Sequence, residues 1–224
     1  MQSYWVQSFF GHQLTNYYAD ELNTEFSIQS IKLNGLDFAE LNNILIRDLN
    51  RDTLAFFPSI SIDVNDIDFK ASKASIKSIV ITDPYLNLYI EEGVNTMNSD
   101  FIVDYFSSEE DKTDSSYFGF EIQNIQFVNT KFKYNDNNRL RDSTVFDFNH
   151  ICLSKLNVAL KDFNTYSDDF LLNIRELSLL EESGFQINNL DSKLLVSSNE
   201  IRLDSTCIST PNSSISTSVL ALNF

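Results

Sequence analysis

Apolar and polar residues alternate with a period of two along most of the chain, beginning near Glu25. The alternation is clearest in SISIDV (59–64), YLNLY (85–89) and KFKY (131–134). A period of two is typical of strands that have one apolar and one polar face. We therefore predict a mainly β fold built on a long, twisted antiparallel sheet.

Two segments follow a helical spacing instead. Residues 4–22 place aromatic and aliphatic side chains at steps of three and four, which predicts an N-terminal amphipathic helix. This segment contains no Lys or Arg, so we expect it to pack against the sheet rather than on a membrane surface. The segment NSDFIVDYFS (98–107) predicts one short helix that begins at Asn98 or Ser99. The charged stretch over 107–116 predicts a mobile loop.

A weak repeat with one shared irregularity occurs four times. The copies are FSIQSIKL (26–33), ASIKSIVI (74–81), FEIQNIQF (120–127) and LNIRELSL (172–179). In each copy the apolar residues follow steps of two, three and two, and the step of three would turn the later side chains to the wrong face. A β-bulge in each copy restores them. We predict these bulges near Ser30, Ser78, Asn124 and Glu176.

The repeat divides the chain into an N-terminal helix over 1–24 and a repeat β-sheet region over 25–224. Residues 214–224 are strand-like to the last position. Because an unpaired terminal strand leaves an exposed edge, we expect the chain to be a fragment of a larger protein, truncated at both ends.

Long strands with one apolar face need something to cover that face. The sheet can close on itself, pack on a second sheet, or leave a groove for an apolar ligand. We expect a sheet that curls into a groove for an acyl chain. The candidate lining residues are Ile79, Ile81, Leu86, Leu88, Phe120, Ile122, Phe132 and Tyr134. The alternative is a structural or protein-binding β module that has a closed core, binds no lipid and recruits a partner through its edges.

Charge excludes one class of partner. Acidic residues outnumber basic ones 32 to 16, which gives a formal net charge of −16. A surface this negative repels phosphate backbones, so we expect no nucleic-acid binding. The two cysteines, Cys152 and Cys207, cannot form a disulfide framework, and we expect both thiols to be unpaired, a single bridge being the alternative.

Residues that could support catalysis are scarce. With only 5 Gly the chain has no glycine-rich phosphate loop, and neither GxSxG nor HExxH occurs. The two histidines, His12 and His150, have no Cys, Asp or Glu at a clear metal-ligand spacing. The acids over 63–68 resemble the start of a calcium loop but lack its glycine and distal glutamate. We expect no enzymatic activity, no metal and no cofactor.

The order of several segments resembles a known family. The segment YADELNT (18–24) precedes FSIQSIKL (26–33), and these are followed by DTLA (52–55) and ITDPYLNL (81–88). This order, over roughly residues 2–135, resembles the membrane-proximal region of AsmA/TamB-like proteins of the Bacteroidetes type.

The resemblance implies a periplasmic location in the cell envelope and an inner-membrane anchor absent from these residues. It also implies a hydrophobic β-groove that transfers lipid between the inner and outer membranes or serves outer-membrane biogenesis. The partners that it implies are a phospholipid or other acyl-chain lipid and an outer-membrane assembly protein. It offers no catalytic residues.

Overall fold

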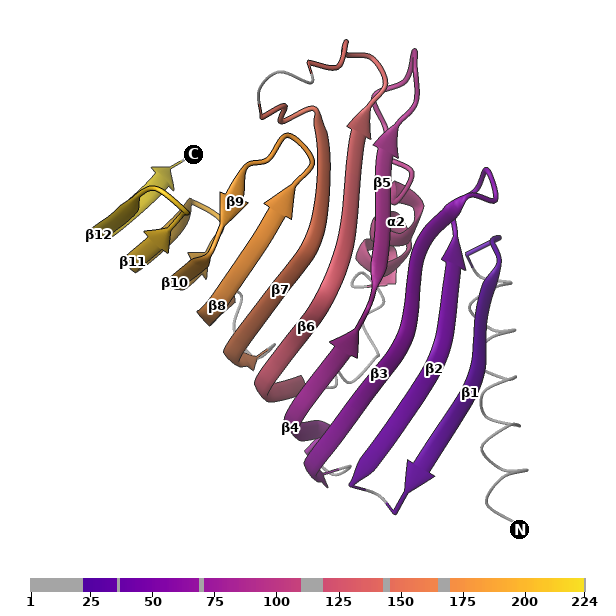
Figure 1. The fold of residues 1–224 in the computed structure, drawn as a ribbon. Coiled ribbons are helices and arrows are strands. Elements are labelled where there is room, and N and C mark those ends of the chain that lie inside the picture. Colours follow the sequence, from indigo (N-terminus) through magenta and orange to yellow (C-terminus); the bar gives the residue numbers. More distant parts are fainter. Residues whose placement is uncertain are drawn as a thin grey trace.

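The computed structural model describes residues 22–35, 37–68, 71–109, 119–142, 146–164 and 170–223. Within these ranges the chain forms one 12-stranded sheet, strongly bent rather than flat (Figure 1). The predicted mainly β fold is therefore confirmed. The N-terminal helix predicted over 4–22 lies outside the described residues, except for Leu22, which is buried in the turn before the first strand.

The first half of the chain contributes five strands and one helix. They are β1 (Phe26–Asn34), β2 (Phe38–Arg47), β3 (Thr53–Asp68), β4 (Lys73–Thr82), β5 (Tyr85–Ile90) and α2 (Asp100–Glu109). The second half contributes seven strands. They are β6 (Gly119–Asp136), β7 (His150–Asn164), β8 (Phe170–Glu181), β9 (Gln186–Ile187), β10 (Asn189–Val196), β11 (Glu200–Ser209) and β12 (Ser214–Asn223).

The sheet order follows the chain order almost throughout. It runs β1-β2-β3-β4-β6-β7-β8-β10-β11-β12, with β5 between β3 and β6 and β9 beside β8. β4 and β5 occupy the same place between β3 and β6, and they are separated by Asp83 and the buried Pro84. Proline has no N–H to donate to a neighbouring strand, which fits the interruption at this position.

The sheet is mainly antiparallel, as predicted, but it contains parallel pairs at its centre. β6 runs parallel to both β4 and β5, and every other pairing of named strands is antiparallel. The chain passes through α2 between β5 and β6, and Gly119 at the start of β6 lies opposite Lys73 at the start of β4. Side chains alternate in the same way in parallel and antiparallel strands, so the hydrophobic pattern could not distinguish the two pairings.

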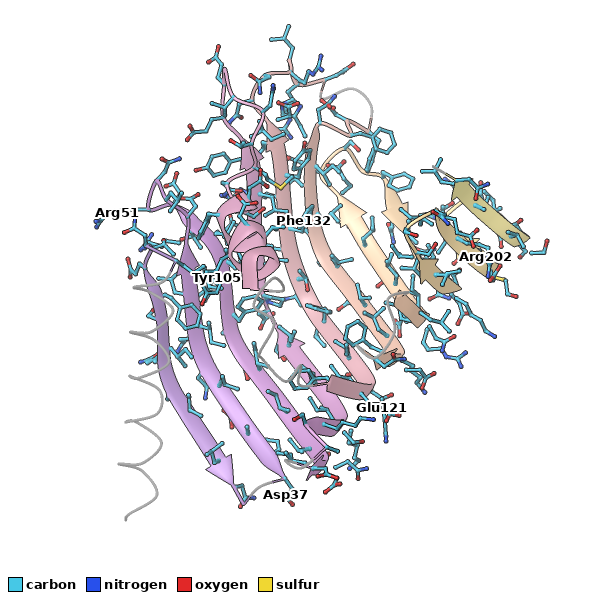
Figure 2. All side chains as sticks on the ribbon, turned by 180° about the vertical axis from the view of Figure 1, so that it is seen from behind. Asp37, Arg51, Tyr105, Glu121, Phe132 and Arg202 are labelled. Atoms are coloured by element: carbon cyan, nitrogen blue, oxygen red, sulfur yellow. The ribbon has the colours of Figure 1, made fainter. Side chains whose placement is uncertain are left out.

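The short helix predicted near 98–107 is confirmed as α2, which lies over one face of the sheet (Figures 1 and 2). Asn98 does not cap it. Its side-chain amide donates to the Asn87 carbonyl and accepts from the Tyr89 N–H, each at 3.0 Å, and so attaches the start of α2 to β5. The loop predicted over 107–116 begins inside the helix, and residues 110–118 lie outside the described ranges.

The predicted bulges are present in two of the four repeat copies. The register shifts beside Ser78 where β4 pairs with β3, and beside Glu176 where β8 pairs with β7. At Ser30 and Asn124 the register with β2 and β7 does not change.

Other irregularities use residues in the left-handed backbone region. Asn43, Asp83 and Asn129 have φ values of 51°, 53° and 55°. Asn and Asp tolerate this conformation better than other non-glycine residues, because their short polar side chains can bond locally. Here they bond across strands: the Asn43 amide donates to Gln29, and the Asn129 amide donates to Asp83. These contacts therefore connect β2 to β1, and β6 to the junction of β4 and β5.

Two buried threonines allow a matched stability test. Thr130 and Thr206 are each 1% exposed, but only Thr206 has a hydroxyl partner, Ser192, at 2.8 Å. Among the described residues the Thr130 hydroxyl has no hydrogen-bond partner. Removing a satisfied buried hydroxyl costs about 1–3 kcal/mol, whereas removing an unsatisfied one costs little. Urea unfolding should show Thr206→Val destabilised and Thr130→Val unchanged or stabilised; equal losses would contradict the assignment.

Candidate functional site

Directly opposite residues on paired strands share one face of a sheet, and apolar residues occupy such positions across seven strands. The first apolar row is Ile31, Leu41, Ile60, Ile81, Phe127, Val158 and Leu177. The second apolar row is Leu33, Ala39, Ile62, Ile79, Ile125, Leu160 and Ile174. Both rows run from β1 to β8 without a polar residue.

The row between them faces the other side and is largely polar. Its members are Lys32, Glu40, Ser61, Val80, Gln126, Ala159 and Glu176. Lys32 and Glu40 form an ion pair at 3.2 Å. A hydrogen bond from Asn42 and then the contact with Lys32 lower the pKa of Glu40. The sheet therefore has one apolar face and one hydrated face.

A third apolar row crosses the sheet beyond the Asp83 kink. Its members are Phe26, Ile46, Ala55, Leu86, Phe132 and Leu153. Thr130 lies three residues after Phe127 and two residues before Phe132. These residues therefore continue the steps of two and three that the apolar residues follow along the strand. The register with β7 shifts at Thr130 and is restored at Phe132, so the strands are irregular at the point where the spacing changes. Exposure along β6 agrees, since Lys131 and Lys133 are exposed and Phe132 is half-buried.

The structure places the eight predicted lining residues on three adjacent strands, β4, β5 and β6. Leu86 lies opposite Phe132, and Leu88 lies opposite Tyr134. Ile81 and Ile122 are buried, and Phe120, opposite Ala74, is 39% exposed. The other five are half-buried, and they are Ile79, Leu86, Leu88, Phe132 and Tyr134. Whether they line a lipid site stays a prediction.

Sequence reasoning missed the rest of this face. Ile79 and Ile81 lie opposite Ile125 and Phe127, which belong to the same repeat copy as Phe120 and Ile122. The four repeat copies contain these residues, but the repeat alone does not show which of its members lie opposite one another once the strands pair.

No second sheet covers the apolar face among the described residues. Every strand in those ranges belongs to the one sheet. Most apolar side chains of the three rows are therefore half-buried, as they would be in a sheet that has neighbours beside it but little above it.

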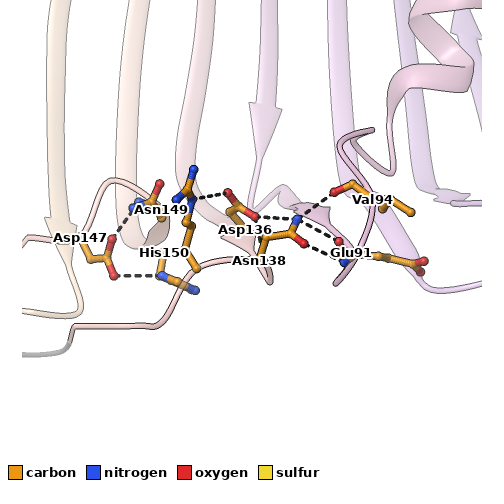
Figure 3. A network of polar contacts seen from close by, with 9 residues as sticks. Glu91, Val94, Asp136, Asn138, Asp147, Asn149 and His150 are labelled. Carbon is orange, nitrogen blue, oxygen red and sulfur yellow. Dashed lines mark hydrogen bonds and ion pairs between the residues drawn. The ribbon is translucent and has the colours of Figure 1, made fainter.

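Polar contacts gather at the end of the sheet where β5 and β6 finish (Figure 3). The Asn138 amide donates to the carbonyls of Glu91 and Val94, at 3.1 and 2.8 Å, and thereby joins the two strand ends. Nearby, Asp147 accepts from the backbone N–H groups of Asp142 and Asn149, which lower its pKa to about 2.

The same carboxylate holds His150, whose Nδ1 lies 2.9 Å from it. His150 is 8% exposed and closes the turn that begins β7. A polar cavity of about 210 Å³ lies beside it, lined by acidic residues, Arg141 and Ser183. These contacts with Asp147 account for the position of His150 without a catalytic role.

A second polar centre surrounds Asp48, which is 1% exposed. Its carboxylate accepts from the Tyr89 hydroxyl at 2.8 Å and from the Asn98 amide at 3.0 Å. Burial is the main cause that raises the pKa of Tyr89 to about 12. The backbone N–H groups of Asn50 and Asp52 complete the set, at 3.0 and 2.9 Å. Asp48 thus connects the β2–β3 turn, β5 and the start of α2.

Neither cysteine is bonded to the other: Cys152 is half-buried and Cys207 is exposed. Burial raises the pKa of the Cys152 thiol, which makes it a poorer nucleophile. Across the described ranges no three His, Cys, Asp or Glu side chains are grouped so as to hold a metal ion.

No protein-family model matches the chain, and no curated protein matches it. In the part of the chain that the structure describes, no helix has the length and apolarity needed to cross a membrane.

Proposed function

We propose that the protein is a non-enzymatic, periplasmic segment of a hydrophobic β-groove that carries acyl-chain lipid. In this proposal it forms the start of a path for lipid transfer between the inner and outer membranes or for outer-membrane assembly. The observation that supports it best is the set of three apolar rows on one face, opposed by a polar row on the other. A continuous apolar strip across many strands suits a long alkyl chain better than a compact polar substrate.

The charge of the protein favours some lipids over others. With a net charge of −16, the surface repels anionic headgroups, so the acyl chain rather than the headgroup must supply most of the binding energy. The resemblance of residues 2–135 to AsmA/TamB-like proteins supports the same proposal, including an inner-membrane anchor and an outer-membrane assembly protein as a partner.

The competing proposal is a structural or protein-binding module without a lipid. In this proposal the apolar face is a closed core, and the edges of the sheet recruit a protein partner without any groove. The two proposals differ in what co-purifies with the protein.

Mild purification followed by native mass spectrometry and organic extraction tests the proposal. We expect phospholipid or fatty acid at a defined ratio to protein, and we expect the delipidated protein to take up a fluorescent fatty acid. Protein that is lipid-free and does not take up the probe, yet is folded, would instead support the structural module.

A further inference from the structure

One end of the sheet carries exposed apolar residues on four separate turns. At this end β5, β6 and β8 finish, and β3 and β7 begin (Figure 1). The exposed fractions of these residues range from 39% to 97%. They are Leu49 in the β2–β3 turn, Val94 after β5, Leu140 and Phe148 between β6 and β7, and Phe185 between β8 and β9. Exposed apolar side chains that gather in one region commonly mark an interaction site.

Contacts join the first three of these turns to one another. Leu49 and Val94 line the same cavity, of about 360 Å³. The Asn50 amide donates to the Glu91 carboxylate and so connects the β2–β3 turn to the end of β5. The Asn138 amide donates to the Val94 carbonyl at 2.8 Å, which connects the loop after β5 to the β6–β7 loop (Figure 3). Leu49, Val94 and the β6–β7 loop therefore belong to one surface.

The β8–β9 turn is joined to the β6–β7 loop in a similar way. Arg141 makes an ion pair with Glu182 of that turn at 2.7 Å. Phe146 packs edge-to-face on Phe148 and on Phe185, with ring centroids 4.8 and 5.1 Å away. Although this contact holds its ring, Phe148 is still 77% exposed. The four turns thus form one continuous surface, which we call the turn-tip surface.

We propose that the turn-tip surface docks on a lipid bilayer without net charge and inserts its apolar side chains at the boundary between headgroups and acyl chains. A bilayer is fluid, so it accepts each side chain without having to match a fixed shape. Apolar residues spread over four turns suit such a surface better than a protein pocket, which would have to fit all of them at once. This docking goes beyond the proposed function and does not rest on it, because it needs no lipid on the apolar face of the sheet.

The basic residues of the four turns are placed to meet lipid phosphates. All three are arginines, and each lies within two positions of an exposed apolar residue. Arg51 follows Leu49, and Arg139 and Arg141 flank Leu140. A guanidinium group matches a phosphate in both shape and charge. Insertion of Leu49 and Leu140 would therefore bring arginines to the depth of the phosphate groups.

The acidic residues of the same turns select against an anionic bilayer. Arg139 pairs with Asp136 at 3.7 Å and Arg141 with Glu182 at 2.7 Å, and both arginine side chains are at least half exposed. Exposed ion pairs contribute little, so a lipid phosphate can replace the carboxylate. Acidic residues outnumber the three arginines in these turns, so the surface repels a net negative charge. Their carboxylates can instead accept from the ammonium group of phosphatidylethanolamine.

Flotation of delipidated protein with vesicles in a density gradient tests the proposal. We expect the protein to float with vesicles of phosphatidylethanolamine and phosphatidylcholine, and we expect added phosphatidylglycerol to reduce the bound fraction at low salt. Fatty-acid uptake is measured separately on the same protein. Protein that floats but takes up no fatty acid would support docking while contradicting the lipid groove.

Leu140→Ser is the decisive variant, because Leu140 is 97% exposed and its replacement changes neither the charge nor the packing of the fold. We expect the affinity for neutral vesicles to fall at least about fivefold, and we expect added Phe148→Ser to lower it further. Leu171→Ser is the matched control: Leu171 is 55% exposed near the start of β8, at the opposite end of the sheet, and its replacement should leave binding unchanged.

Circular dichroism should show the same folded state in the Leu140→Ser and Leu171→Ser variants. Absence of flotation with neutral vesicles, stronger binding to anionic vesicles, or equal losses in these two variants would overturn the proposal.

Discussion

Phe132→Glu is expected to abolish lipid uptake while the sheet stays folded. Phe132 lies on β6 in the third apolar row, opposite Leu86 on β5 and Leu153 on β7. It is half-buried, so a carboxylate at this position can keep its hydration on an open face. An acyl chain cannot replace that water, because burying an unpaired charge costs far more than one side-chain contact with lipid contributes.

The same substitution separates the two proposed functions. In a closed core the new charge would have no access to water and would unfold the protein. We therefore expect circular dichroism and the thermal midpoint to change little, while binding of a fluorescent fatty acid falls more than tenfold. Phe132→Leu, which keeps the apolar surface, should retain binding.

Val128→Glu provides the matched control on the same strand. Val128 is 38% exposed, and it lies opposite Thr82 on the hydrated face. Val128→Glu introduces the same charge into the same strand as Phe132→Glu. Any general effect of added negative charge therefore appears in both variants. Equal loss of lipid binding in Phe132→Glu and Val128→Glu, or unfolding of Phe132→Glu, would contradict an open lipid-binding face.

Much of this apolar face could be predicted from the sequence, because the spacing of residues within a single strand determines which of them share a face. The steps of two, three and two identify the same-face residues within each strand, and the strand positions of Ile79, Leu86 and Phe132 follow from alternation alone. The pairing of these strands is not local. That β6 runs parallel to β4, and so places Ile125 opposite Ile79, depends on the crossover through α2.

The polar centre around Asp48 could not be predicted from the sequence for a similar reason. Asp48 and Asn98 are fifty positions apart, and nothing in the alternation of either segment indicates that they meet. The short spacing of Asp48, Asn50 and Asp52 does indicate a turn, since aspartate commonly accepts from the backbone two residues later. Its contacts with β5 and α2 emerge only when the sheet is assembled.

Asp48→Ala is expected to cause the largest loss of stability of any single polar substitution proposed for this protein. The change leaves four donors without their acceptor: the N–H groups of Asn50 and Asp52, the Tyr89 hydroxyl and the Asn98 amide. Unsatisfied buried donors cost about 1–3 kcal/mol each, but some regain water once the side chain is removed. We therefore expect the free energy of unfolding to fall by about 2–4 kcal/mol in urea titrations.

Two further substitutions establish the cause of that loss. Asp48→Asn keeps the size of the side chain and one acceptor oxygen but presents an NH₂ group to the remaining donors, so its stability should fall between those of the wild type and the alanine variant. Asp63→Ala removes a carboxylate that makes an exposed ion pair with Lys77 at 2.9 Å, and such pairs contribute about 0–1 kcal/mol. If Asp48→Ala is no less stable than Asp63→Ala, the four hydrogen bonds do not hold the β2–β3 turn, β5 and α2 together.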